Sequence, residues 1–246
     1  METGIPEGGK ALRRPSLSVI IPALNEVENI GETIESVGGA VDVEVIVVDG
    51  GSSDGTREAA RSRGARVISS ARGRGAQMNG GARVARGEVL LFLHADTRLP
   101  PGFDRYARET LARAGVAAGA FRLHIMGDLT GLSFLEKTAN LRSRFLQFPY
   151  GDQAIFLKRD LFGQMGGFPD IPIMEDFELV RRLHRRGRVV TVPVAVATSA
   201  RRWERLGVVR ATLINYAIVL LYYLGVSPSR LTRWFRPPEG SSLFLI

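Results

Sequence analysis

Two carboxylates follow apolar runs that have the length and character of buried strands. Asp96 lies just beyond the run 89–93, and Asp49 comes directly after the run 43–48. In an open α/β sheet, ligands bind at the edge formed by the carboxyl ends of the strands. A carboxylate there can serve a ligand, but it can equally cap the turn that follows it. The two positions taken alone leave ligand binding and capping open.

Small residues surround these carboxylates. Residues 50–56, after Asp49, are rich in glycine and small polar side chains, which allow close backbone approach and open a helix N-terminus. Both features suit a ligand that carries phosphate. The segment 72–87 is also rich in glycine and arginine. It is typical either of a flexible RNA-binding tract or of a loop that opens a helix near 77–86, and we favour a loop packed beside a nucleotide.

Strand and helix patterns alternate along the first half of the chain, which predicts a parallel, right-handed α/β unit. Asn25 is a candidate N-cap for the first helix, and Pro22 is expected to end the first strand. The expected strands are 17–21, 43–48, 66–68 and 89–93. Of the expected helices, the first begins after Asn25, the second ends at about 62, and two more span 77–86 and roughly 103–114.

The second half is predicted to add a strand at 116–125, an amphipathic and irregular helix at 129–148 that lines a cleft, and an apolar run at 154–157. Glu175 and Asp176 open a helix that ends at Gly187, and acidic residues in a first turn are favoured by the helix dipole alone. A late strand is expected at 189–192, before Pro193.

The composition limits the class of protein. The 246 residues are 45% hydrophobic and 24% charged, as in an ordinary globular protein. The net charge of +8 favours anionic partners, but the arginines are scattered without a nucleic-acid-reading motif, so we expect no nucleic acid as partner. The lack of cysteine excludes disulfides and fits the cytosol. Residues 1–15 lack the apolar core of a signal peptide and are expected to be a disordered lead-in.

The segment 208–226 is strongly apolar from 211 onward and is flanked by arginines. It is short for a bilayer span, which takes about 20 apolar residues, and Asn215 interrupts it. A helix lying in a membrane interface, a dimer contact and a helix packed on the sheet all fit this pattern.

Taken in order, five motifs resemble glycosyltransferase family 2, which has the GT-A fold. They are residues 20–26 (Ile-Ile-Pro-Ala-Leu-Asn-Glu), 47–56 (Val-Val-Asp-Gly-Gly-Ser-Ser-Asp-Gly-Thr), the loop 73–82, residues 92–96 (Phe-Leu-His-Ala-Asp) and the pair Glu175-Asp176. The match covers about 17–203. Within the family, the chain is similar to a small bacterial branch whose strand ends in His-Ala-Asp-Thr.

The resemblance implies a Rossmann-like, mostly parallel sheet flanked by helices, with a C-terminal helical extension. The expected organisation is the lead-in 1–15, a GT-A domain at 16–204, and an extension at 205–246 for which membrane association is one option.

The resemblance also implies an inverting glycosyltransferase that moves a sugar from a nucleotide-diphosphate donor, UDP- or GDP-linked, to an acceptor hydroxyl. Asp176 matches the family's catalytic base. Glu175 could orient the acceptor, or it could serve as the base in place of Asp176. The implied donor-binding residues are Pro22, Ala23, Asn25, Glu26, Asp49, Asp54, Gly73, Gly75, Gln77, Asp96, Arg202 and Trp203. Gly151, Asp152, Gln153 and Glu175 are assigned to the acceptor.

One departure affects the expected metal. Asp96 matches the last carboxylate of the family's Asp-x-Asp motif, which binds a divalent ion on the diphosphate, but His94 stands where the first Asp is usual. Because Mn²⁺ tolerates nitrogen ligands better than Mg²⁺ does, we expect Mn²⁺ to serve at least as readily as Mg²⁺. His94 could equally stand behind the metal ligands.

Two other functions compete with sugar transfer. A nucleotidyltransferase also uses an α/β sheet and a carboxylate-held metal, but it would usually have a glycine-rich, basic loop after the first strand. A non-catalytic nucleotide-sugar or membrane-binding module of the same fold would bind without turnover. We expect a cytoplasmic protein, with peripheral contact at the inner face of the cell membrane and a lipid-linked acceptor as further hypotheses.

Overall fold

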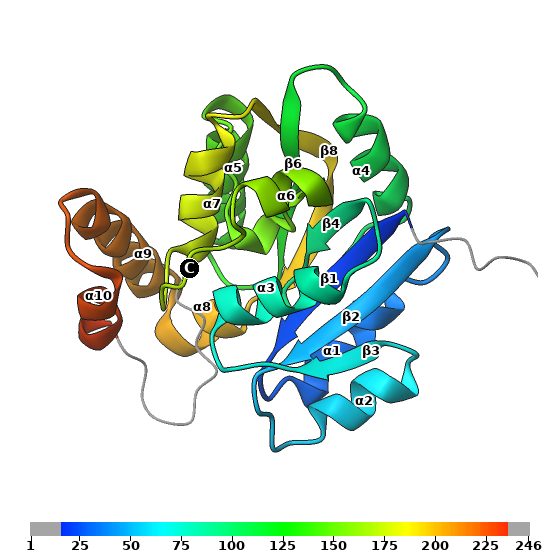
Figure 1. Cartoon of the computed structure of the whole chain (residues 1–246). Coiled ribbons are helices and arrows are strands. Elements are labelled where there is room, and N and C mark those ends of the chain that lie inside the picture. The colour runs from blue at the N-terminus through cyan, green and yellow to red at the C-terminus, as the bar shows by residue number, and fades with distance from the viewer. Residues whose placement is uncertain (1–15, 236–246) are drawn as a thin grey trace, which may run out of the picture.

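The computed structural model describes residues 16–235 (Figure 1). The predicted lead-in 1–15 and the last part of the C-terminal extension, 236–246, lie outside the described residues.

An eight-stranded sheet forms the centre of the molecule, with strand order β3-β2-β1-β4-β7-β6-β8-β5. β1, β2, β3 and β4 are parallel to one another, and β6 is parallel to β8, whereas β7 runs antiparallel to β4 and β6. The sheet is therefore mostly parallel, as predicted. The strands are β1 (Leu17–Ala23), β2 (Val43–Asp49), β3 (Arg66–Ser69), β4 (Val89–Phe92), β5 (Thr97–Arg98), β6 (Val116–Met126), β7 (Phe156–Lys158) and β8 (Arg188–Ser199).

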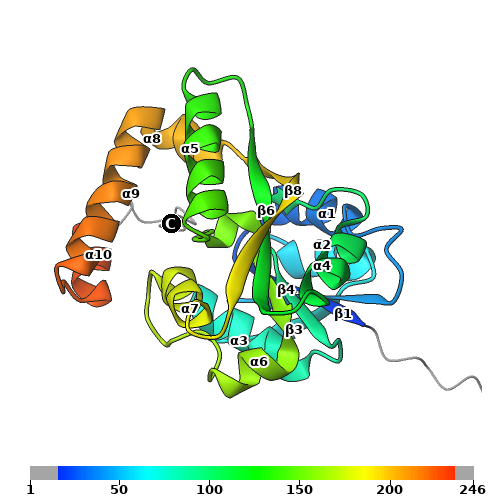
Figure 2. The same cartoon turned by 90° about the horizontal axis from the view of Figure 1, so that it is seen from above.

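Helices cover both faces of the sheet (Figure 2). One face carries α1 (Val27–Glu35), α2 (Thr56–Ser62) and α4 (Phe103–Leu111), and the other carries α3 (Arg74–Val84), α6 (Arg159–Gln164) and α7 (Glu175–Leu183). A short 3₁₀ turn, η1 (Gly151–Gln153), precedes β7. Away from these two layers lie α5 (Leu132–Phe145), α8 (Arg201–Leu206), α9 (Val208–Tyr223) and α10 (Pro228–Trp234).

The packing of β1 explains why its sequence is almost entirely apolar, with Ser18 as its one polar side chain. Val19 and Ile21 pack in the cluster that includes α1 and α4, whereas Ile20 packs in the cluster that includes α3, α6 and α7. Successive side chains of a strand point to opposite faces, and both faces here are covered by helices. β1 is buried along its whole length.

Two prolines that were expected to end strands lie inside them instead. Pro22 is within β1, but it follows the last β1–β4 pair at Ile20, so its missing N–H removes no bond to β4. Pro193 is within β8, which runs on to Ser199, and the prediction of a strand at 189–192 was therefore too short. The register with β6 is irregular between Thr191 and Ala195, and Pro193 is exposed there, where a bulge tolerates it.

The apolar C-terminal segment forms a helix, α9, that packs against α10. Among residues 16–235, no helix has the length and apolar character needed to cross a bilayer.

A glycine in β6 permits close packing of β7. An added Cβ at Gly119 would lie 2.2 Å from the ring of Phe156, which is fully buried. We expect Gly119→Ala to lower the free energy of unfolding by about 1–3 kcal/mol, because the ring must shift within a packed core. Urea unfolding measures the change.

Gly163→Ala is the matched control, because Gly163 lies in α6, is exposed and has open space around its Cα. It should leave stability unchanged or raise it by up to about 1 kcal/mol. Equal effects of the two substitutions would contradict this account of β6 and β7.

Candidate active site

The order of the strands places a topological switch point between β1 and β4. From β1 the chain moves outward through β2 and β3, then returns to β4 on the other side of β1. The chain leaves β1 toward one side of the sheet and leaves β4 toward the other side, and ligands in open α/β sheets bind in the crevice at such a point. Glu26 follows β1, and Asp96 follows β4.

Arg201, at the start of α8, joins these two loops. Its Nη2 donates to Glu26 Oε2 at 2.7 Å and to Asp96 Oδ2 at 3.0 Å. The Glu26 side chain is 1% exposed, whereas those of Arg201 and Asp96 are 28% and 24% exposed. Burial raises the pKa of Glu26, and Arg201 opposes that rise. A single cation thus bridges two carboxylates at the switch point, and its partner Asp96 stays partly accessible.

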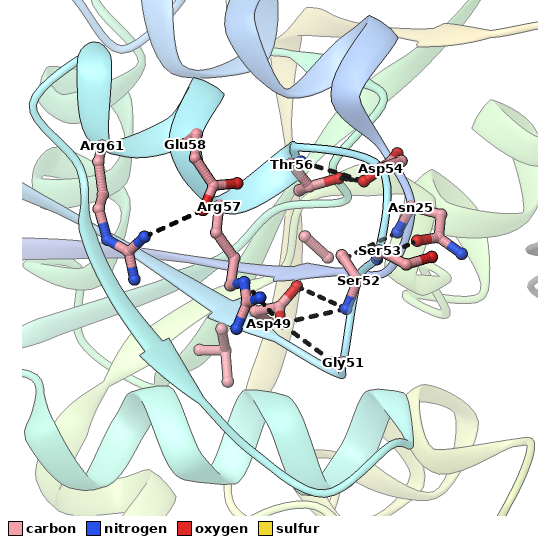
Figure 3. A network of polar contacts seen from close by, with 12 residues as sticks. Asn25, Asp49, Gly51, Ser52, Ser53, Asp54, Thr56, Arg57, Glu58 and Arg61 are labelled. Atoms are coloured by element: carbon pink, nitrogen blue, oxygen red, sulfur yellow. Dashed lines mark hydrogen bonds and ion pairs between the residues drawn. The ribbon is translucent and has the colours of Figure 1, made fainter.

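The loops after β1 and β2 form one polar network (Figure 3). The Asn25 amide oxygen accepts a bond from the Ser53 N–H at 3.0 Å, and the Ser52 hydroxyl accepts one from the Asn25 N–H at 2.9 Å. Asp54 accepts bonds from the N–H groups of Val27 and Thr56. These side chains fix the two loops to each other and so shape the space above the ends of β1 and β2.

Asp49 and Gln77 make further hydrogen bonds that hold the ends of β1 and β2 and the loop after β2 in place. The Asp49 carboxylate, in a residue only 1% exposed, accepts bonds from the N–H groups of Gly51 and Ser52. Gln77 Nε2 donates to the carbonyls of Ala23 and Val48, which links the ends of β1 and β2. Asp49 and Gln77 thus both bond groups of the chain itself, and their roles toward a donor stay predictions.

A second, buried group lies beside the end of β4. Gly151 donates its N–H to Asp176 Oδ2 at 2.6 Å, and Phe177 donates its N–H to Asp176 Oδ1 at 2.7 Å. An added Cβ at Gly151 would lie 3.0 Å from Asp176 Oδ2 and 3.1 Å from His94 Nε2, so glycine is what lets these side chains approach the loop. Burial lowers the pKa of His94 to about 3, with Arg74 adding to the effect, so the imidazole is neutral at pH 7.

Arg74 and Glu175 connect the N-terminal ends of α3 and α7. The two side chains form a salt bridge through Arg74 Nε and Glu175 Oε1, and they are 6% and 1% exposed. Burial by itself would lower the pKa of Arg74, but Glu175 and Asp176 outweigh it and raise that pKa. Gly75 allows the close approach, since an added Cβ would lie 3.1 Å from the Pro169 carbonyl oxygen and 3.6 Å from the Glu175 Cβ.

The remaining predicted site residues separate into two sets. Pro22 and Ala23 lie at the end of β1, and Gly73 lies just before α3. Gln153 is fully buried, and its Nε2 donates to the Phe121 carbonyl and the Ser143 hydroxyl, which makes it a support of the loop 151–155.

Asp152 and Trp203 line a different space, a groove between α5 and α9. Arg202, which was expected near the diphosphate, bonds through Nη2 to Asn215 of α9, and it is Arg201 that meets Asp96.

His94 and Asp96 have different neighbours, although they are two residues apart. Asp96 faces Arg201, whereas His94 lines a small cavity with Gly151 and Asp176. Within residues 16–235, no group of three or more His, Cys, Asp or Glu side chains could hold a metal ion.

Sequence reasoning missed Arg74 and Arg201. Arg74 lies in the arginine- and glycine-rich segment that was interpreted as a loop, and Arg201 stands beside the residue that was chosen instead. Arg74 immediately precedes Gly75, a small residue at the start of a helix, and this was the one local sign of close packing around it.

The chain matches the family model for glycosyl transferase family 2 over residues 18–165. A PGL/p-HBAD biosynthesis glycosyltransferase of Mycobacterium bovis is 33% identical over 171 residues, which cover 63% of each protein. A glucosyl-3-phosphoglycerate synthase of Mycolicibacterium paratuberculosis is 35% identical over 102 residues, 37% of this chain and 30% of that protein. The chain thus spans less than two thirds of the length of the curated relatives that it matches.

Solved structures share the fold. A mannosyltransferase from Pyrobaculum calidifontis, in complex with GDP-Man and Mn²⁺, has a TM-score of 0.63 at 23% identity, covering 84% of this chain and 62% of that one. Glucosyl-3-phosphoglycerate synthase from Mycobacterium tuberculosis, in complex with Mn²⁺, UDP and glucosyl-3-phosphoglycerate, has a TM-score of 0.61 at 23% identity, covering 93% and 83%. These likenesses show a GT-A type architecture.

The buried pair of α3 and α7 should dominate the stability of the site. Arg74→Met leaves the Glu175 carboxylate without its cation in a buried place, and we expect it to lower the free energy of unfolding by about 3–5 kcal/mol. Adding Glu175→Gln should recover part of that loss, because the isolated charge is then gone. Chemical denaturation measures both changes.

Arg63→Met is the control, because it breaks an exposed pair with Glu35, whose side chains are 38% and 63% exposed. Its cost should stay below about 1 kcal/mol. A comparable loss in the Arg74 and Arg63 variants would contradict the assigned role of the buried pair.

Proposed function

The chain belongs to glycosyltransferase family 2, and from this premise we propose that it transfers a sugar from a nucleotide-diphosphate donor to an acceptor hydroxyl, with inversion at the anomeric carbon. The observation that most supports the proposal is the arrangement at the switch point. There Glu26 and Asp96 meet Arg201, and the Asp176 group lies beside the end of the same β4 strand. The positive charge of Arg201 suits the departure of the phosphate leaving group. The Asp176 carboxylate suits removal of the proton from the acceptor hydroxyl.

We assign the donor to the loops after β1, β2 and β4. The polar network of Asn25, Asp54 and their partners would hold the nucleoside, and the sheet edge at Asp96 would receive the diphosphate. Arg201 stays protonated near neutral pH and sits where it can stabilise the departing nucleoside diphosphate. Both UDP- and GDP-linked donors fit this assignment, and relatives of the fold have been solved with each nucleotide.

A divalent cation fits the residues present if the donor shares in holding it. Asp96 supplies one accessible oxygen ligand, which suits a hard ion that also binds phosphate oxygens. When bound, such an ion would act as a Lewis acid that neutralises charge developing on the diphosphate. We assign His94 to the base side, because its neighbours are Gly151 and Asp176.

Asp176 is proposed as the general base. The acceptor oxygen attacks the anomeric carbon and forms the new glycosidic bond, while the bond from that carbon to the phosphate oxygen breaks and its electron pair leaves with the nucleoside diphosphate. The acceptor proton passes to the Asp176 carboxylate. The N–H groups of Gly151 and Phe177 hold this carboxylate in place, and Glu175 is held by Arg74 at the start of the same helix.

A direct assay distinguishes the competing functions. The protein is incubated with labelled UDP- and GDP-linked sugars, Mn²⁺ and a lipid extract. Release of nucleoside diphosphate together with a labelled glycolipid is expected. Binding without release would indicate a non-catalytic module. Release of sugar 1-phosphate would indicate nucleotidyl transfer, and release of nucleoside monophosphate would indicate phosphosugar transfer. The lipid extract also tests the hypotheses of a lipid-linked acceptor and a membrane-proximal site.

Asp176→Asn should reduce transfer by about 10²–10⁴-fold, because an amide cannot take the acceptor proton. Donor binding, measured by calorimetry, should stay unchanged, since Asp176 faces the acceptor side. Asp170→Asn is the control, because Asp170 is an exposed carboxylate just before the same helix. Transfer near the wild-type rate in the Asp176 variant would show that another base acts.

We expect sugar transfer to need a divalent ion that Asp96 helps to hold. Treatment with EDTA should stop transfer, and Mn²⁺ should restore it at least as well as Mg²⁺. Asp96→Asn should weaken the Mn²⁺-dependent binding of UDP or GDP by about tenfold or more, since it removes the only charged ligand assigned. Calorimetry with and without Mn²⁺ measures this change. Activity that survives EDTA and gains nothing from either ion would refute the assignment.

A further inference from the structure

The outer face of α9 is apolar, although it is exposed. Its large side chains recur at alternating steps of four and three residues, which places them in one stripe along the helix. They are Val209, Leu213, Tyr216, Leu220 and Tyr223, each between 61% and 73% exposed. With a rise of 1.5 Å per residue, the stripe is about 20 Å long.

The opposite face of α9 already packs against the protein. Ala211 and Ile218 are fully buried, and Ile218 belongs to a cluster with Phe177 of α7 and Leu231 of α10. A helix on the surface of a globular protein normally has a polar outer face. Because α9 is apolar on both faces, its outer face is suited to an apolar environment outside the described part of the chain.

Neighbouring helices extend this apolar surface. α5 lies beside α9 in Figure 2 and carries Phe134, Leu141 and Phe145, which are exposed and share one side of that helix. α10 packs against α9 and carries the exposed Trp234. Large exposed apolar side chains gathered on neighbouring helices mark an interaction surface.

The same part of the chain carries positive charge without acidic residues. Residues 205–235 contain four arginines and no aspartate or glutamate. The arginines are Arg205, Arg210, Arg230 and Arg233, and all four are exposed. Within residues 16–235, none of them forms an ion pair. An apolar stripe bordered by arginines is complementary to a bilayer that contains anionic phospholipid.

We propose that the outer face of α9, together with Trp234 of α10, binds the surface of a bilayer that contains anionic phospholipid. The apolar stripe enters the boundary between headgroups and acyl chains, and the arginines contact lipid phosphates. Tyr216, Tyr223 and Trp234 combine an apolar ring with a polar group, which suits the headgroup level. This surface goes beyond the proposed sugar transfer, because it concerns where the protein binds.

A second copy of the chain fits this face less well than a bilayer does. A copy seated on the same face would bring its own arginines against those of the first, and like charges repel. An anionic surface attracts these arginines instead. The bilayer therefore accounts for both the apolar stripe and the charge around it.

Flotation with phospholipid vesicles tests the surface without any sugar donor. We expect vesicles of phosphatidylcholine with about 30% phosphatidylglycerol to bind the full chain at least about tenfold more tightly than vesicles of phosphatidylcholine alone.

Leu213→Glu separates binding by this face from attraction by the net charge. It places a carboxylate in the stripe and should weaken binding to the anionic vesicles at least about tenfold, because that charge resists leaving water. Val41→Glu is the matched control, because Val41 is 67% exposed against 63% for Leu213 and the change in net charge is the same. Val41 lies two residues before β2, whose start is far from α9 in Figure 1. Its substitution should weaken binding less than about threefold.

A pair of double variants tests the arginines. Arg210→Gln with Arg233→Gln should weaken binding to the anionic vesicles at least about tenfold, since two contacts with lipid phosphates are lost. Arg105→Gln with Arg113→Gln removes the same charge from exposed positions in and just after α4, and it should have an effect below about threefold.

The other occupants of this face would give different results. Absence of vesicle binding, equal affinity for the two kinds of vesicle, or equal effects of the matched variants would overturn the proposal. A dimer in analytical ultracentrifugation that Leu213→Glu dissociates would show that a second copy covers the face, and it would also overturn the proposal. Melting temperatures confirm that the variants fold, and Leu220→Glu serves if Leu213→Glu does not. Vesicle binding without sugar transfer would leave this surface in place and count against the proposed function alone.

Discussion

The structure of the site depends on charged side chains that are buried away from water at one edge of the sheet. Arg74 and Glu175 are almost fully buried, and a buried ion pair is tolerated only when both partners are present and well placed. Their bond ties the start of α3 to the start of α7, and α7 begins with the residue pair that includes Asp176. An arginine at the start of α3 thus helps to set the position of the proposed base. Small residues such as Gly75 make this contact sterically possible.

Arg201 extends the same principle to the C-terminal part of the chain. It comes from α8, after the last long strand, and it bridges Glu26 and Asp96 at the switch point. Without a cation between them, these two carboxylates would repel each other. The start of α8 is therefore part of the arrangement at this sheet edge.

Much of the fold could be predicted because its signals are local. The strands β1, β2 and β4 are mostly apolar, despite Ser18 in β1 and Glu44 in β2, and the helices between them end near glycines. The alternation is therefore visible residue by residue. The extent of β8 was not visible, because Pro193 is tolerated only by a register break with β6, which is a property of the paired strands. The residues of the site divide in the same way, into those with a local signal and those without one. Asp49, Asp96 and Asp176 stand out in their own segments, whereas Arg74 pairs with a residue 101 positions away and Arg201 with one 175 positions away. No short-range pattern records such pairs.

Two adjacent arginines at the start of α8 contact different parts of the chain. Arg201 contacts the carboxylates assigned to the donor, and Arg202 contacts Asn215 of α9. The contact with the sheet edge and the attachment of α9 therefore share a single turn of helix, so a change that unwound this turn would loosen both contacts together.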